Sequence, residues 1–385
     1  MKHKKLVVLT VWFIFGLAAS GTAQVSPQTE PSGDSISQGL WWLYHLQYTH
    51  ARELFDQYIH SHPADPAGYF YKTATDWWQL AQEYDYQLPD VVKLLEEDYQ
   101  DTLRTSYQLL ESSGDAKTKG LACLYAGGAE GLKGRWLVTQ GQWIKAYFRG
   151  KNGHRMLKKA LEYDPTLYDA YLGLGIYDYY TDTLPGVQRL LAALLIHGDR
   201  QRGLQELQWA IDKGDHARVE AQMFLIEIYT WEEQSPAKAL PIAQDLHQEF
   251  PKRPAMYLAE IMDYYELNQW DHVTNEAKEY LMKSEEAEPY YRHEGVYPAR
   301  YCLGVAALLG QRDPDTCLTY MNKIVDEADP SSRWVSFAYL RMGQVYDLKG
   351  EREKALSYYH KVLERPHFWG SHHLARQYIR EPFKY

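Results

Sequence analysis

Four histidines near the C-terminus form the densest group of side chains that could bind a metal ion. His360, His367, His372 and His373 could each supply an imidazole nitrogen. A zinc site would also need an acidic or cysteine ligand at a matching offset, and the sequence places none there. We therefore expect these histidines to be packing and surface residues on a terminal helix, and we predict no metal ion and no other cofactor.

Motifs for catalysis are also absent from the sequence. It contains no glycine-rich phosphate loop, no nucleophile elbow, no His-Glu-x-x-His motif and no Cys-x-x-Cys pair. Acidic clusters such as Glu96-Glu97-Asp98 and Glu285-Glu286 resemble carboxylate pairs, but a solvated helix face explains them. We therefore predict no catalytic residues and a protein that is not an enzyme.

Three cysteines are compatible with an oxidising compartment, and their odd number leaves at least one thiol free. Cys302 and Cys317 fall on opposite helices of one predicted repeat, so a disulfide between them is an open hypothesis. Cys123 lies among apolar residues, which predicts a place in the core.

Aromatic and acidic side chains in the middle of the chain form the candidate binding site. They are Trp136, Trp143, Tyr177, Asp178, Tyr179, Tyr180 and Asp182. Aromatic faces stack on sugar rings, phenol hydroxyls donate hydrogen bonds and carboxylates accept them. A structural interpretation stays open beside this one, because Asp182 can cap a helix that follows Pro185 while the tyrosines stabilise an inserted loop.

The first 35 residues predict export. Three lysines precede an apolar stretch from Leu6 to Ala19, and small residues follow it up to Ala23. The stretch is too short to cross roughly 30 Å of hydrocarbon at about 1.5 Å per residue, which makes a retained anchor the weaker alternative. We expect residues 1–23 to be a cleaved signal peptide and residues 24–35 a flexible leader. The mature chain would then lie in the periplasm or outside the cell without stable membrane insertion.

The charge balance is acidic. Lys and Arg number 41 against 51 Asp and Glu, a formal net charge of -10. Cleavage after Ala23 removes three lysines and no acid, which leaves -13. This surplus disfavours nucleic acids and anionic lipid headgroups as partners and permits basic or neutral ones.

From Ile36 onwards, apolar residues recur at helical spacing in repeating units. The clearest unit contains Tyr339, Met342, Gly343, Tyr346, Gly350, Ala355, Tyr359 and Val362. Gly343 and Ala355 are small enough for two antiparallel helices to approach closely, with a turn at Gly350. No strand-like alternation competes with this pattern. We predict one all-α domain over residues 36–385, with about eight helix pairs and a C-terminal capping helix.

These offsets resemble the tetratricopeptide repeat (TPR), in which helix pairs stack into a right-handed superhelix, an α-solenoid. The segment from Gly175 to Pro185 is similar to a family of exported bacterial TPR proteins that has no established activity. Further matching positions are Gly198-Asp199-Arg200, Gly203-Leu204, Glu220-Ala221 and Phe250-Pro251. More distantly, the chain is similar to the eukaryotic TPR family that includes a yeast protein needed for inclusion-body clearance. The closer resemblance covers about residues 115–265. It implies the fold and export, and His197-Gly198 departs from its Pro-Gly or Gly-Gly pair.

Three central units are longer than the repeat. The additional residues are Leu132 to Arg149, Tyr177 to Leu195 and part of Ala67 to Glu97. We expect these helical insertions to form extra helices or wide loops over one face of the array.

The predicted architecture indicates a binding function. Concave surfaces of stacked helix pairs usually hold an extended peptide or a partner's helix. Our first hypothesis is a non-catalytic exported scaffold that binds a basic or neutral protein or peptide partner on its concave face. The alternative is a cell-envelope glycan or another small ligand bound under the central inserts.

Overall fold

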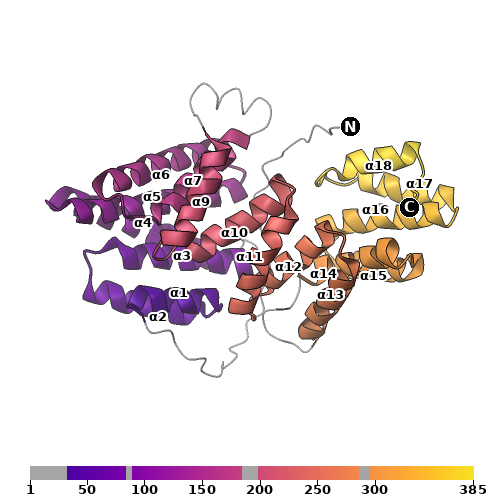
Figure 1. Ribbon diagram of the computed structural model, residues 1–385, viewed down its shortest axis with the longest axis horizontal. Coiled ribbons are helices and arrows are strands. Elements are labelled where there is room, and N and C mark those ends of the chain that lie inside the picture. Colours follow the sequence, from indigo (N-terminus) through magenta and orange to yellow (C-terminus); the bar gives the residue numbers. More distant parts are fainter. Residues whose placement is uncertain (1–32, 84–88, 184–197, 286–290, 292–294) are drawn as a thin grey trace. The chain divides into compact units, whose positions relative to one another are not determined.

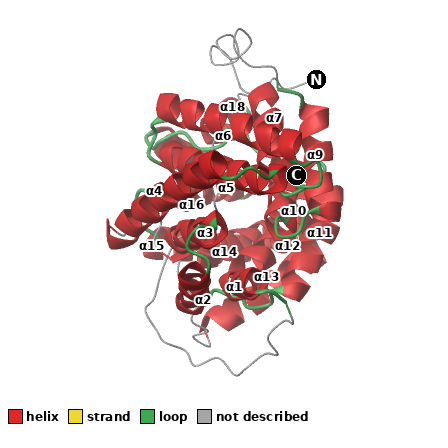
Figure 2. Cartoon of the chain, turned by 90° about the vertical axis from the view of Figure 1, so that its left-hand side faces the viewer, coloured by secondary structure: helices red, strands yellow, loops and turns green. Residues whose placement is uncertain are grey.

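The structure is a computed structural model that describes residues 33–83, 89–183, 198–285, 291 and 295–385. Within these ranges every regular element is a helix and no strand occurs (Figure 1; Figure 2). The predicted all-α fold of paired helices is therefore confirmed. The predicted signal peptide lies outside the described residues. Among those described, no helix combines the length and the apolar composition that a membrane span requires.

The chain divides into two compact units, the first of which ends at Glu232. Its helices are α1 (Ser35–Tyr44), α2 (Tyr48–Ser61), α3 (Pro66–Glu83), α4 (Pro89–Ser112), α5 (Ala116–Thr139), α6 (Trp143–Tyr163), α7 (Ala170–Thr183), α9 (Arg200–Lys213), α10 (Arg218–Glu227) and the π-helical η1 (Ile228–Glu232). Four pairs form, α1/α2, α3/α4, α5/α6 and α7/α9 (Figure 1). The first helices of successive pairs also contact each other, so α1, α3, α5, α7 and α10 make one continuous face. We call it the first-helix face.

The second unit runs from Glu233 to Tyr385. Its helices are α11 (Pro236–Glu249), α12 (Pro254–Glu266), α13 (Trp270–Glu285), α14 (Val296–Val305), the π-helical η3 (Ala306–Gly310), α15 (Pro314–Glu327), α16 (Arg333–Leu348), α17 (Arg352–Leu363) and α18 (Ser371–Arg380). Pairs form between α12 and α13, α14 and α15, and α16 and α17.

The α16/α17 pair shows how the repeat positions act. A Cβ atom at Gly343 would lie 2.4 Å from the Tyr359 ring, so only glycine lets this tyrosine pack between the two helices. The Tyr359 hydroxyl donates a hydrogen bond to Asp347 Oδ2 at 2.7 Å, which satisfies its buried polar end. Gly350 has a φ of +75° and forms the turn, a conformation that suits glycine.

Where the structure describes the central enlargement, its residues lengthen helices. Helices α5 and α6 have 24 and 21 residues and are joined by the short turn 140–142, in which Gly141 has a φ of +68°. Residues 132–149 therefore continue α5, cross this turn and begin α6, so the expectation of a wide loop or an extra helix there is wrong. Residues 177–183 continue α7, and the remainder of that insert lies outside the described residues.

The three cysteines are buried free thiols. Cys302 Sγ lies 3.5 Å from Met262 Sδ, to which it donates a weak hydrogen bond. The hypothetical Cys302–Cys317 disulfide is therefore not present in the structure. Burial raises the pKa of the Cys302 and Cys317 thiols, so these two thiols remain protonated and poorly reactive at neutral pH.

Helix α18 covers the last pair of the second unit. The fully buried Ala375 packs into a cluster with Leu340, Ala355, Tyr359 and Val362. Leu374, Tyr378 and Ile379 add partly buried contacts. This helix thus removes from water the apolar face that a terminal repeat would expose.

We expect Ala375→Asp to destabilise the second unit by about 3 kcal/mol, because it places an unpaired carboxylate in this cluster. Gln377→Asp, at an exposed position of the same helix, should change the free energy of unfolding by less than about 0.5 kcal/mol. Chemical denaturation of both variants measures the difference, and equal stabilities would show that α18 does not protect the cluster.

Candidate functional site

A cavity of about 360 Å³ lies within the first unit, on its first-helix face. Helices α1, α3, α5 and α7, the N-terminal two thirds of α6 and the beginning of α10 form its walls. Along α5 the lining runs from Leu124 to Val138, a length of about 21 Å at 1.5 Å per residue. The walls are mostly apolar, and they include Leu40, Phe70, Leu132, Leu172 and Ile176. A cavity of this size and lining is typical of a binding site.

Glycines on α5 and α6 shape one wall of the cavity. A Cβ atom at Gly153 would lie 2.9 Å from the Gly127 carbonyl oxygen, so here the two helix backbones touch. At Gly131, one turn further along α5, a Cβ atom would have no neighbour within 4 Å. Both Gly127 and Gly131 line the cavity, but Gly127 serves close packing whereas the space beside Gly131 is open.

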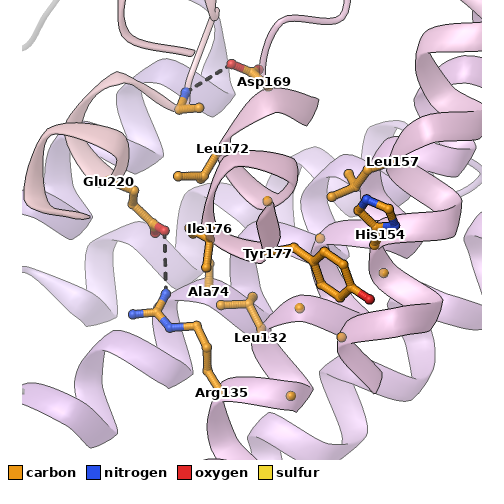
Figure 3. Close-up of a pocket in the computed structure, with 18 of the residues that line it drawn as sticks. Ala74, Leu132, Arg135, His154, Leu157, Asp169, Leu172, Ile176, Tyr177 and Glu220 are labelled. Carbon is orange, nitrogen blue, oxygen red and sulfur yellow. Dashed lines mark hydrogen bonds and ion pairs between the residues drawn. The ribbon is translucent and has the colours of Figure 1, made fainter. Parts of the chain in front are cut away.

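An ion pair stands at one side of the cavity. The Arg135 guanidinium lies 3.7 Å from Glu220 Oε2 (Figure 3). Trp78 Nε1 also donates a hydrogen bond to Glu220 Oε1 at 2.8 Å. The guanidinium also stacks against Trp77 and Phe224, at 4.7 and 4.9 Å from the ring centroids. These contacts hold both charges in place, since a buried ion pair needs partners for its remaining polar groups.

His154 and Tyr177 stand on the opposite side (Figure 3). Their rings stack with centroids 4.1 Å apart. Burial, assisted by the positive charge of Lys158, lowers the pKa of His154 to about 4, so the imidazole is neutral at physiological pH. Its Nε2 atom has no hydrogen-bond partner among the described residues but faces Asp178, whose Oδ1 lies 3.9 Å away. The nearby Tyr147 hydroxyl is also buried without a hydrogen-bond partner among the described residues, and it is available to a polar group of a ligand.

Asp169 caps the start of α10 at a third point of the wall. Its Oδ1 atom accepts hydrogen bonds from the backbone N–H groups of His216 and Ala217, both at 3.0 Å (Figure 3). Burial nevertheless raises the pKa of this carboxyl. The capping fixes the segment that leads into α10 and carries Glu220.

A buried carboxyl pair lies behind His154. Asp178 is 2% exposed, accepts a hydrogen bond from Arg202 Nε and has its Oδ1 atom 3.9 Å from His154 Nε2. Burial and the adjacent Asp178 raise the pKa of Glu206 to about 8. Two close carboxyls do not ionise together easily, so Glu206 retains its proton near neutral pH.

The structure brings together three of the seven predicted ligand residues. Trp143, Tyr177 and Tyr180 line the cavity. Trp136 and Tyr179 are instead buried outside its lining, at 8% and 0% exposure.

The two predicted acids also lie outside the cavity lining. Asp178 is engaged by Arg202, and the exposed Asp182 accepts a hydrogen bond from the Arg200 backbone N–H at 3.3 Å. The helix that Asp182 was expected to cap, after Pro185, lies outside the described residues. Instead, Asp182 contributes to the start of α9, where Asp199 is the N-cap.

Sequence reasoning missed the glycines, the Arg135–Glu220 pair and His154. A signal existed in the small residues of α5 and α6, which recur three or four positions apart. The C-terminal histidines are separate from this site: His372 Nε2 lies 2.8 Å from the Arg365 carbonyl oxygen. Across the described ranges, no three His, Cys, Asp or Glu side chains are grouped to hold a metal ion.

Alanine at two glycines of α5 should have opposite effects on stability. We expect Gly131→Ala to stabilise the protein by about 0.5–1 kcal/mol, because alanine favours a helix and the position is open. Gly127→Ala should destabilise it by about 1–3 kcal/mol, because the new methyl group meets Leu157 at 2.7 Å. Denaturation curves measure both, and the same sign for the two variants would contradict this geometry.

Stability should depend on pH through Glu206. Its pKa is about 8 in the folded protein against an ordinary value of 4.5, so the folded state retains a proton that the unfolded chain loses. This contribution is complete below about pH 4.5 and is lost as the pH rises through about 8. We expect the free energy of unfolding of Glu206→Gln to fall less over this window than that of the unmodified protein.

Denaturant titrations at several pH values test this expectation. Glu353→Gln, at an exposed position of α17, is the control and should follow the unmodified protein. Parallel curves for Glu206→Gln and the unmodified chain would show that Glu206 does not retain its proton.

One helix pair of the second unit matches a known repeat family. Residues 337–366, which cover most of α16 and all of α17, match the tetratricopeptide repeat family. No curated protein sequence matches the chain. Among solved structures, yeast Tom70 is similar with 12% identity and a TM-score of 0.38, over 91% of this chain and 89% of that one.

Two further structures are similar at the same level. A monomeric IFIT1 mutant with m7Gppp-AAAA has 14% identity and a TM-score of 0.30, over 86% of this chain and 70% of that one. A chain of the APC/C hetero-tetramer Cut9–Hcn1 has 14% identity and a TM-score of 0.28, over 91% of this chain and 72% of that one. The family match at α16 and α17 identifies one repeat. The chain therefore contains a tetratricopeptide repeat, and its described residues form helix pairs.

Proposed function

We propose that the protein is a non-catalytic binding scaffold that holds an apolar segment of a protein or peptide partner on its first-helix face. The observation that carries this proposal is the cavity of about 360 Å³ along α5. First helices of neighbouring pairs form most of it together with α6, and such first helices provide the binding surface in stacked helical repeats. The partner's side chains would enter the cavity as anchors.

The lining favours apolar anchors. Full burial of one Leu, Ile, Phe or Met side chain contributes roughly 1.5–3 kcal/mol, so two anchors contribute roughly 3–6 kcal/mol toward a micromolar affinity of about 8 kcal/mol. Interfaces commonly depend on a few such side chains in well-packed pockets. The glycine at position 131 leaves room for one of them.

Orientation of the partner would come from the few polar groups in the wall. The Tyr147 hydroxyl is buried without a partner among the described residues, and a backbone amide or carbonyl can satisfy it. The neighbouring His154 ring, which stacks on Tyr177, is neutral at physiological pH and adds no charge to this wall. Recognition would therefore combine apolar contact with a hydrogen bond to Tyr147.

A cell-envelope glycan is the second candidate. Trp143 is 46% exposed where it lines the cavity, as a sugar-stacking residue would be. A sugar ring also presents several hydroxyl groups, which need polar partners when they are buried. The mostly apolar wall offers few, so the peptide candidate is better supported.

Export belongs to the same proposal. The lysines, apolar stretch and small residues of the first 23 positions support delivery to the periplasm or the cell exterior. The net charge of -10 supports a basic or neutral partner.

Selection of peptides from a random displayed library tests the binding function. We expect the unmodified protein to enrich peptides with two or more large apolar residues. Gly131→Leu should reduce the affinity of an enriched synthetic peptide at least about tenfold, because the leucine side chain fills the cavity that the anchor needs.

Gly131→Ala is the matched control, since it adds one methyl group and leaves most of the volume. Its affinity should stay within about threefold of the unmodified protein. Failure to enrich any apolar peptide, or equal affinities for the Leu and Ala variants, would contradict peptide binding in the cavity. Enrichment of envelope glycans with loss on Trp143→Ala would favour the second candidate instead.

A further inference from the structure

Helix α6 carries a second feature on a side that is rotated by about 100° from its cavity-lining positions. Ile144, Phe148, Lys151, Arg155 and Lys158 are exposed and follow one another at spacings of 4, 3, 4 and 3 residues. Such spacing places side chains on one face of a helix. We call this face the outer stripe of α6.

The N-terminal end of the outer stripe is apolar and open to water. Ile144 and Phe148 are 76% and 58% exposed, and the adjacent Trp143 is 46% exposed. They belong to the few large apolar side chains that the described residues expose, and they follow directly on the turn 140–142. Exposed apolar groups that gather at one point mark a surface for interaction.

The C-terminal part of the outer stripe is cationic. Lys151 and Lys158 form no ion pair with any described residue, and Arg155 has only a long hydrogen bond to Asn152 at 3.5 Å. Helix α6 as a whole has six Lys or Arg residues and a single acidic residue, Glu162. This helix is therefore strongly basic within a chain of net charge -10.

We propose that the outer stripe of α6 docks the protein on an anionic phospholipid bilayer. Ile144 and Phe148 enter the boundary between headgroups and acyl chains, while Lys151, Arg155 and Lys158 contact lipid phosphates. The interaction is peripheral and reversible, and of the three exposed apolar residues only Trp143 also lines the cavity.

The order of side chains along the helix favours a bilayer over an acidic protein. Phe148 and Lys151 are three residues apart, about 4.5 Å along the axis, so the apolar end can enter a few ångströms while the cations stay at headgroup level. Tryptophan beside the apolar end also suits the membrane interface. An acidic protein would engage the cations but would gain little from the 76% exposed Ile144, which lies seven residues before Lys151.

The acidic net charge does not prevent this docking. At physiological salt the Debye length is about 8 Å, so a surface that touches α6 responds mainly to the charges of that helix. Each Lys or Arg near an anionic leaflet contributes about 1 kcal/mol to binding. Three cations on one face therefore matter more locally than distant carboxylates.

A fluorescent label beside the apolar end tests the proposal in the full chain. Lys145→Cys provides an exposed thiol between Ile144 and Phe148, and the three native cysteines are buried, so an NBD label attaches selectively. With phosphatidylcholine vesicles that contain phosphatidylglycerol, we expect the emission to rise and shift to the blue. Added Lys151→Gln and Arg155→Gln substitutions should weaken the vesicle partition about thirtyfold.

Matched controls separate this docking from other contacts. A label on Met282→Cys, at an exposed position of α13, should not respond, and Lys278→Gln with Lys323→Gln should leave the partition unchanged. The proposal is overturned if the label at position 145 stays water-like while the chain sediments with vesicles, because another segment then anchors it. It is also overturned by an equal response to pure phosphatidylcholine, or by a response to polyglutamate without one to vesicles.

Discussion

The contact between α5 and α6 at Gly127 and Gly153 is the constraint on which the first unit depends. The two backbones meet there because neither residue has a side chain, and a Cβ atom at position 153 would lie 2.9 Å from the Gly127 carbonyl oxygen. Leu157 packs against Gly127 and fills the remaining space. One turn later along α5, no atom lies within 4 Å of a Cβ built at Gly131. The run of small residues that allows the two helices to touch therefore also leaves a cavity beside them.

The charged groups beside this cavity are each held by several contacts. Arg135 is flanked by Trp77 and Phe224 and paired with Glu220, which is itself bonded to Trp78. A buried ion pair adds little to stability, because desolvation of both charges opposes their attraction. The arrangement is better understood as positioning: it fixes the end of α5 relative to α10 and so keeps one wall of the cavity in place.

The sequence predicted the helix pairs well, because the spacing of small residues reflects helix packing. Gly343 makes room for the Tyr359 ring, Gly350 forms the turn, and Ala355 is small enough to be fully buried. It predicted the site only in part. Trp136 and Trp143 look alike in the sequence, yet one is buried outside the cavity and the other lines it, since the α5–α6 turn lies between them. The cavity itself was not predictable. A glycine in a helix is compatible both with close approach of a neighbouring helix and with open space beside it. Which of the two occurs depends on the side chains of the neighbouring helix, and the sequence alone does not give their positions.

The net charge of the whole chain says little about the charge of one helix, and α6 is the example. An average over the whole chain hides a basic helix, because screening makes interactions local. On that helix the cavity-lining positions Trp143, Tyr147, Gly150 and His154 repeat at spacings of 4, 3 and 4. The outer stripe repeats the same spacings one residue later, from Ile144 to Arg155. A shift of one residue is a rotation of about 100°, so the two surfaces point in different directions but share one rigid helix. Any contact that fixes the outer stripe therefore also fixes the wall that carries His154 and Tyr147.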